Sequence, residues 1–261
     1  MNEIITKIGD HFIRISSESD RLAKFFQKNF NSRVNIENQQ IDLVIIVKDG
    51  YGVSFINYEV EVTKQDDKIL FRREDYLIKV DSDYKKAEIF VHDEFALKHA
   101  LTNLYSSFIV YHNWGLLIHS SCVIEAGKAH IFAGQSGAGK STAAKLSYPR
   151  EILSDEATLV KITSNDITIY NSPFRSELEA EPIERISKLE SIQLLKQSLH
   201  NNRIIIPSSD ALIRLMDKVF FWPTCQKEIK TILRLLTSLV LNVHVYELHF
   251  QKNNTFWKLI S

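Results

Sequence analysis

The chain has 261 residues, enough for one or two domains with a buried core. Hydrophobic residues make up 44% of it and charged residues 25%, which is ordinary for a soluble globular protein. Because 32 basic residues balance 32 acidic ones, the composition provides no global attraction to nucleic acid or to an anionic membrane.

The first 110 residues predict a β-rich module. Apolar runs and apolar–polar alternation predict strands over residues 11–16, 41–47, 52–62, 68–71, 75–80 and 87–91. Apolar residues at helical spacing predict one or two helices, over residues 19–30 and 95–110. We expect the strands to be mostly antiparallel. The module then serves in packing or oligomerisation or, alternatively, in substrate or leader recognition.

The rest of the chain mixes strands and helices. Strands are expected over residues 115–125 and 129–133, with a turn at Ala126–Lys128, and a strand from Ile152 ends in an acidic pair. A hairpin over residues 157–170 follows, then a short strand at 204–206, helices over 208–219 and 226–240, and a strand over 243–250. Residues 185–200 are polar and give no assignment. The predicted fold class is α/β, mixed and β-rich.

A glycine-rich loop lies between the strand at 129–133 and the next helix. It matches the phosphate-binding pattern G-x-x-x-x-G-K-[ST] with Gly134, Gln135, Ser136, Gly137, Ala138, Gly139, Lys140, Ser141 and Thr142. Glycines allow a tight turn, so successive N–H groups can surround an anion. Lys140 is expected to reach the outer phosphates, and the Ser141 hydroxyl to bind Mg²⁺. The loop therefore predicts a nucleotide site with ATP and Mg²⁺ as cofactors.

Chemical groups flank this loop in the sequence. Asp155 and Glu156 end the next strand, and their alternating side chains can face a metal and an acceptor hydroxyl separately. Glu177 is a further candidate metal ligand, although a surface charge explains it equally well. His119 lies on the strand before the loop. A histidine there can orient a phosphate or acceptor, or can simply be a hydrogen-bonded core residue.

Together these segments resemble the HPr kinase/phosphorylase-like family, which has a phosphoenolpyruvate-carboxykinase-like phosphate-loop fold. The resemblance is carried by Gly115–Ser121, Glu125–Lys128, Gly134–Thr142 and Leu153–Glu156. It extends best to small HPr-kinase-related proteins such as the lasso peptide kinases. It implies a catalytic Asp155 that accepts the hydroxyl proton, an active-site His119, a phosphate-contacting Lys140, and metal binding by Ser141, Glu156 and Glu177. The arginine- and glycine-rich signature of true HPr kinases is missing from the sequence.

We therefore expect a β-rich module over residues 1–110 and an HPr-kinase-like catalytic domain over residues 111–261. The expected activity is ATP-dependent phosphorylation of a serine hydroxyl on a peptide or small protein, such as a ribosomally made precursor peptide. The alternatives are a non-catalytic nucleotide-binding regulatory module and a kinase of a free-serine-type small molecule. Neither nucleic acid nor membrane is expected as a partner, and a homo-oligomer is left open. Without a signal peptide pattern or an apolar span, the expected location is cytoplasmic.

Overall fold

The computed structural model describes residues 2–30, 39–176 and 185–260. These residues form a mixed α/β structure that is rich in strands, 40% against 28% helix, which confirms the expected fold class at this level. Of the described residues, 2–112 and 221–229 form one compact unit, and 113–176, 185–220 and 230–260 form a second. Within these ranges, no helix has both the length and the apolar character needed to cross a lipid bilayer.

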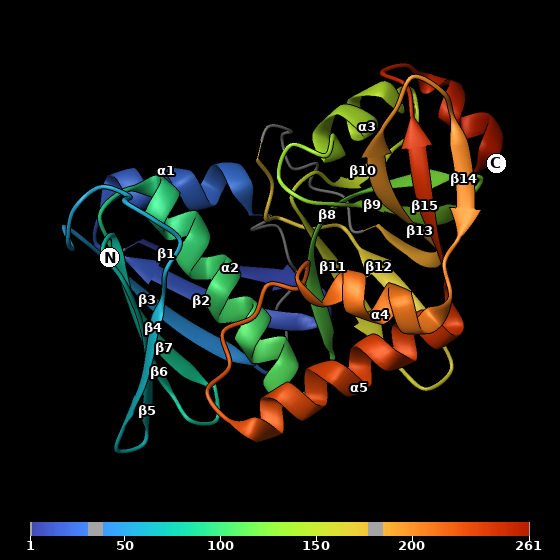
Figure 1. The fold of residues 1–261 in the computed structure, drawn as a ribbon. Coiled ribbons are helices and arrows are strands. Elements are labelled where there is room, and N and C mark those ends of the chain that lie inside the picture. The colour runs from blue at the N-terminus through green and yellow to red at the C-terminus, as the bar shows by residue number, and fades with distance from the viewer. Residues whose placement is uncertain (1, 31–38, 177–184, 261) are drawn as a thin grey trace. The chain divides into compact units, whose positions relative to one another are not determined.

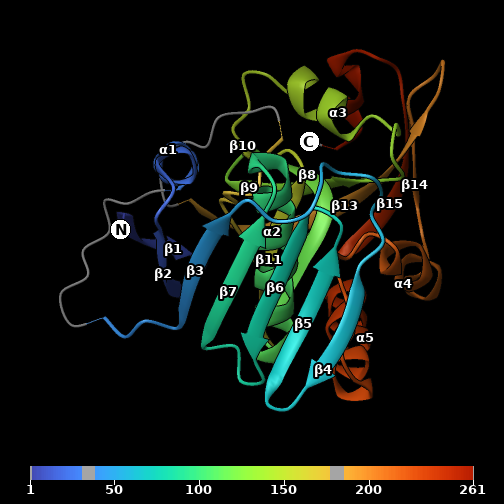
Figure 2. The same cartoon turned by 90° about the vertical axis from the view of Figure 1, so that its left-hand side faces the viewer.

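The first unit is built on a seven-stranded sheet in the order β1-β2-β3-β7-β6-β5-β4 (Figures 1 and 2). The strands are β1 (Asn2–Ile8), β2 (His11–Ser17), β3 (Leu43–Asp49), β4 (Glu61–Gln65), β5 (Lys68–Arg73), β6 (Tyr76–Asp81) and β7 (Lys86–Val91). The helices are α1 (Asp20–Asn29) and α2 (Glu94–Tyr111). Helix α2 packs on β6 and β7, and the Asp93 carboxylate caps it by accepting the Ala96 N–H at 2.8 Å.

The strands of this unit differ in part from the sequence-based expectation, and β1 was not expected. Of the strand expected over residues 52–62, only Glu61 and Val62 lie in a strand, β4, and the chain before it turns at Gly50 and Gly52, which have φ of +84° and +61°. A Cβ on Gly52 would lie 2.0 Å from the Glu74 carbonyl oxygen, so only glycine allows this approach. Among the described residues the sheet is mostly antiparallel, as expected: four of its six strand pairs are antiparallel, while β3 runs parallel to both β2 and β7.

The second unit contains an eight-stranded sheet in the order β10-β8-β11-β12-β13-β15-β14, in which β9 pairs with both β8 and β13. The strands are β8 (Gly115–Glu125), β9 (Lys128–Ala133), β10 (Ile152–Ser154), β11 (Ala157–Ile162), β12 (Ile167–Tyr170), β13 (Ile186–Gln197), β14 (Asn202–Ile205) and β15 (His244–Phe250). The helices are α3 (Lys140–Leu146), α4 (Ser208–Met216), α5 (Gln226–Asn242), whose residues 230–242 belong to this unit, and the short 3-10 helix η1 (Asn254–Leu259).

Strand β13 occupies the segment that the sequence left unassigned. It pairs in parallel with β9 and with β15, so it is central to the sheet. Its pattern is obscured because several of its buried residues are polar. They are satisfied by hydrogen bonds: the Ser191 hydroxyl lies 2.9 Å from His130 Nδ1, and Gln193 accepts from Arg203 Nε at 3.1 Å. A buried polar network therefore replaces the apolar run expected of a central strand.

An apolar core holds α3 against the sheet. It consists of Val123, Phe132, Ala143, Ala144, Leu195, Leu248, Phe250, Phe256 and Trp257. Helix η1 is hydrogen-bonded to the C-terminal end of α3. Trp257 Nε1 donates to Ser147 Oγ at 2.9 Å, and that hydroxyl donates to the Ala143 carbonyl at 2.6 Å. The start of α3, and the glycine-rich loop that leads into it, are therefore attached to a packed support.

Candidate functional site

The glycine-rich loop has the conformation expected of an anion cradle. It connects β9 to α3, and Gly137 and Gly139 adopt the left-handed backbone region with φ of +77° and +104°. Lys140 is buried, and its ammonium donates to the carbonyls of Gly134 and Gln135, both at 3.1 Å. The loop thus wraps around its own lysine. In such a loop the Lys140 ammonium can donate to phosphate oxygens in place of the two carbonyls.

Close packing fixes this conformation at both ends of the loop. A Cβ on Gly134 would lie 2.7 Å from Ala138 Cβ, and a Cβ on Gly139 would lie 2.8 Å from Phe250 Cζ. The Gly137 carbonyl accepts from Gln197 Nε2 at 2.8 Å. Ser136 is exposed beside Gly137, whereas Ser141 and Thr142 lie half-buried in the first turn of α3.

Strand β8 changes partners next to the loop. Its Ser120 pairs with Ala133, the last residue before the loop, whereas its His119 pairs with Ala157 at the start of β11. The Ser120 N–H also donates to the Glu156 carbonyl at 3.0 Å. We call this point the β8 junction. It brings the start of the loop, His119 and the acidic pair, which are far apart in the sequence, into one neighbourhood.

His119 is half-buried at the β8 junction, with its ring 5.4 Å from that of Phe220. Burial and the nearby ammonium groups of Lys140 and Lys218 lower the pKa of His119 to about 4. The imidazole is therefore neutral at pH 7. It can donate one hydrogen bond and accept another, but it adds no positive charge to the site.

The two predicted carboxylates have different surroundings. Burial and the Lys218 ammonium lower the pKa of Lys140, and the negative charge of half-buried Glu156 partly opposes this lowering. Asp155 is 3% exposed and accepts from both the N–H and the hydroxyl of Ser176, each at 3.2 Å. Glu156 thus acts on the loop lysine, while Asp155 already binds a serine hydroxyl.

The predicted metal ligands are only partly described. Glu177 lies outside the described residues, so its position relative to Ser141 and Glu156 is not given. In the part of the chain that the structure covers, no group of three or more His, Cys, Asp and Glu side chains is arranged to hold a metal ion. A Mg²⁺ ion here would depend on phosphate oxygens and water in addition to Ser141 and one carboxylate, which is its usual coordination with nucleotides.

Lys218 lies at the site, although the sequence did not predict it as a site residue. It was expected within a helix over residues 208–219, but α4 ends at Met216. The chain then runs antiparallel beside β8: the His119 N–H donates to the Lys218 carbonyl at 2.7 Å, and Ile118 forms a bridge with Val219. Lys218 is 7% exposed and forms an ion pair with Asp217. Only this long-range bridge brings it to the site, and no local pattern signals it.

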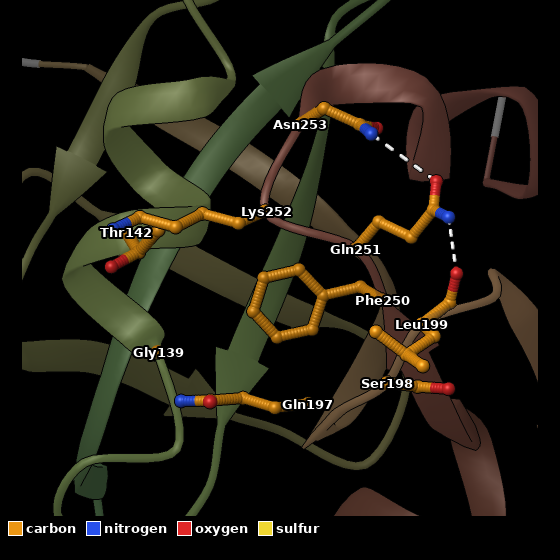
Figure 3. Close-up of a pocket in the computed structure, with 9 residues that line it drawn as sticks. All are labelled: Gly139, Thr142, Gln197, Ser198, Leu199, Phe250, Gln251, Lys252 and Asn253. Carbon is orange, nitrogen blue, oxygen red and sulfur yellow. Dashed lines mark hydrogen bonds between the residues drawn. The ribbon is translucent and has the colours of Figure 1, made fainter.

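Two pockets meet the loop at its two ends. The larger, about 460 Å³, touches Gly139 and Thr142. Its other lining residues are Gln197, Ser198, Leu199, Phe250, Gln251, Lys252 and Asn253, with the Phe250 ring near the centre (Figure 3). The smaller, about 300 Å³, touches Gly134 and Gln135 and is also lined by Leu194, Leu195, Lys196, Ile213, Arg214, Asp217, Lys218 and Glu247. The larger is within the size range of small-molecule sites.

Comparison with known proteins corrects the family expected from the sequence. A family model described as "SynChlorMet cassette protein ScmC" matches residues 92–261, more than half of the chain. The chain was expected to resemble the HPr kinase/phosphorylase-like proteins, and this family match shows that assignment to be wrong. The segments that carried the resemblance are short, and a phosphate loop such as Gly134–Thr142 is shared by unrelated families. No curated protein matches the chain.

Proposed function

The chain belongs to the family of the SynChlorMet cassette protein ScmC, and we propose that it is an ATP-dependent kinase of serine hydroxyls. The acceptor is a peptide or small protein, such as a ribosomally made precursor peptide. One observation carries the proposal. The β8 junction gathers a glycine cradle with its buried Lys140, a neutral His119 and two carboxylates, which are the kinds of group that phosphoryl transfer requires.

ATP and Mg²⁺ fit the residues of the loop. Lys140 Nζ donates to two loop carbonyls, and a phosphate oxygen could accept these hydrogen bonds in their place. Ser141 and Glu156 would hold Mg²⁺, which supplies charge neutralisation for the phosphates. The pocket beside Gly139 and Thr142 has room for the nucleoside (Figure 3). The loop amides and Lys140 then hold the phosphates in place.

Asp155 is the candidate for orienting the acceptor. Its carboxylate accepts the Ser176 hydroxyl at 3.2 Å, so it is positioned to accept an alcohol hydrogen bond. A substrate serine in place of Ser176 would pass its proton toward Asp155 as its oxygen bonds to the γ-phosphorus, while the bond from that phosphorus to the β–γ bridging oxygen breaks and ADP leaves. Neutral His119 can donate a hydrogen bond to a phosphate oxygen, and it adds no positive charge that would hold the phosphate more tightly. We include in this proposal the finer fold assignment, a phosphoenolpyruvate-carboxykinase-like phosphate-loop core.

A non-catalytic nucleotide-binding module is the second candidate, and the same contact favours it. Both oxygens of Asp155 accept from Ser176, which is what a residue with a purely structural role would do. In that case Asp155 anchors the chain that follows β12, as Arg175 does by donating to the carbonyls of Ile152 and Leu153, both at 3.1 Å.

The test is transfer of the terminal phosphate from radiolabelled ATP with Mg²⁺, using a library of serine peptides and, separately, free serine. We expect label on peptides and no label on free serine. Lys140→Met is the control and should label neither. Label on free serine alone would identify a small-molecule kinase. ATP binding with no transfer to any acceptor would favour the non-catalytic module.

A further inference from the structure

We propose that Lys218 is a second phosphate-binding residue, whose ammonium holds the terminal phosphate at the Gly134 end of the loop. The inference rests on the proposed function, because it assigns an end of the ATP molecule to each end of the loop. Lys218 is not part of the phosphate-loop pattern. It reaches the site only through the chain segment that leaves α4.

The strand register determines where Lys218 points. The Ile118–Val219 bridge is antiparallel, so Lys218 lies directly opposite His119 and Phe220 lies opposite Leu117. Two backbone hydrogen bonds hold this register, from the His119 N–H to the Lys218 carbonyl at 2.7 Å and from the Phe220 N–H to the Leu117 carbonyl at 2.9 Å. Directly opposed residues project from the same face of an antiparallel pair. Lys218 and His119 therefore share one face at the β8 junction.

The two pockets set the direction of a bound nucleotide. The larger pocket adjoins Gly139 and Thr142, where the loop enters α3, and we have placed the nucleoside there. The phosphate chain then runs back along the loop, so its terminal phosphate lies toward Gly134 and Gln135. The pocket at that end includes Lys218 among its lining residues. Lys218 is largely buried and shares a face with His119, so it is available to the terminal phosphate, whereas Lys196 in the same lining is exposed to solvent.

The charges around this pocket favour an anion, since Lys196, Arg214 and Lys218 line it against Asp217 and Glu247. The ammonium groups of Lys140 and Lys218 are close enough that each acts on His119 and Lys218 acts on Lys140. Both side chains are largely buried, which makes their mutual repulsion stronger than at an exposed surface. The partner of Lys218, Asp217, is 63% exposed, so solvent weakens its compensation. A bound polyphosphate would neutralise both cations at once.

The experiment measures the dissociation constants of MgATP, MgADP and tripolyphosphate by titration calorimetry for the wild type, Lys218→Met, Lys218→Arg and Lys196→Met. Lys196→Met removes the same charge from an exposed side chain in the same pocket wall. We expect Lys218→Met to weaken MgATP binding about 10- to 100-fold, as for the loss of one hydrogen bond to a charged group, and MgADP binding by less than about three-fold. Lys218→Arg should retain more MgATP affinity than Lys218→Met, and Lys196→Met should resemble the wild type.

Wild-type affinity for MgATP in both Lys218 variants would overturn the inference and leave the proposed function intact. An equal loss in Lys196→Met would also overturn it, since a general field effect would then explain the loss. Lys218-dependent binding of tripolyphosphate without binding of MgATP would support the anion site and overturn the nucleotide proposal. Thermal unfolding of each ligand-free variant checks folding. If Lys218→Met is unfolded, the ratio of the MgATP to the MgADP dissociation constant in Lys218→Arg decides: a ratio equal to that of the wild type would overturn the inference, and a larger ratio would support it.

Discussion

Replacing Gly139 by alanine tests whether the loop is held in a conformation that only glycine allows. Gly139 has a φ of +104°, and a new Cβ would lie 2.8 Å from Phe250 Cζ. The backbone strain costs about 1–3 kcal/mol. Phe250 cannot move aside freely, because it is buried in the core that supports α3 and packs edge-on against Phe256. Overpacking there adds about 1–3 kcal/mol.

The matched control is Gly127→Ala. Gly127 also has a positive φ, +78°, but nothing lies within 4 Å of a Cβ built on it. We therefore expect Gly139→Ala to lower the free energy of unfolding of the second unit by about 2–6 kcal/mol and Gly127→Ala by only about 1–3 kcal/mol. Urea denaturation followed by tryptophan fluorescence measures both. Phe250→Leu in the Gly139→Ala background should recover part of the difference. Equal destabilisation by the two alanines would refute the packing argument.

The remaining predictions concern Lys140, His119 and Trp257. Lys140→Met should reduce MgATP affinity by at least about ten-fold in titration calorimetry, because it removes a charged donor to the phosphates; unchanged affinity would exclude the loop as the ATP site. The pKa of His119 is about 4 in the folded chain against 6.5 for an ordinary histidine, so the unfolded chain takes up the proton first. The stability due to neutral His119 is thus complete above about pH 6.5 and is lost as the pH falls toward 4. Urea unfolding at pH 7.5 and pH 5 should show a smaller loss for His119→Asn than for the wild type, and equal losses would contradict the assigned pKa. Trp257→Phe removes the indole donor to Ser147 and should lower the free energy of unfolding by about 1–2 kcal/mol. A melting temperature equal to that of the wild type would contradict this.

The sequence predicted the local parts of the site better than its assembly. The loop and its flanking strand and helix follow from residue types over a short stretch, and all three are present. The residues of β13 carry buried serine and glutamine side chains whose partners lie on other strands, so alternation alone could not identify it. Lys218 was missed for a related reason. Its place depends on one bridge to Ile118, about a hundred residues earlier, which no local spacing reveals.

Resemblance in motifs also misled the family assignment. The loop, the preceding histidine strand and the acidic pair are short segments of residue types that phosphate-binding sites commonly use. Shared chemistry can therefore produce similar short segments in different families. The match to the ScmC family extends over residues 92–261, which includes α5 and β15 as well as the loop, and it decides the family for that reason.

The central claim is that Asp155 orients an acceptor hydroxyl at a working kinase site. The most direct test is the rate of phosphate transfer from MgATP to a labelled serine peptide by Asp155→Asn and by the wild type, with MgATP affinity measured on the same samples. Asparagine has the same shape but cannot accept the proton. We expect Asp155→Asn to bind MgATP like the wild type and to lose transfer by at least about a hundred-fold, at the low end of general-base contributions. Transfer by Asp155→Asn at the wild-type rate would contradict this role of Asp155.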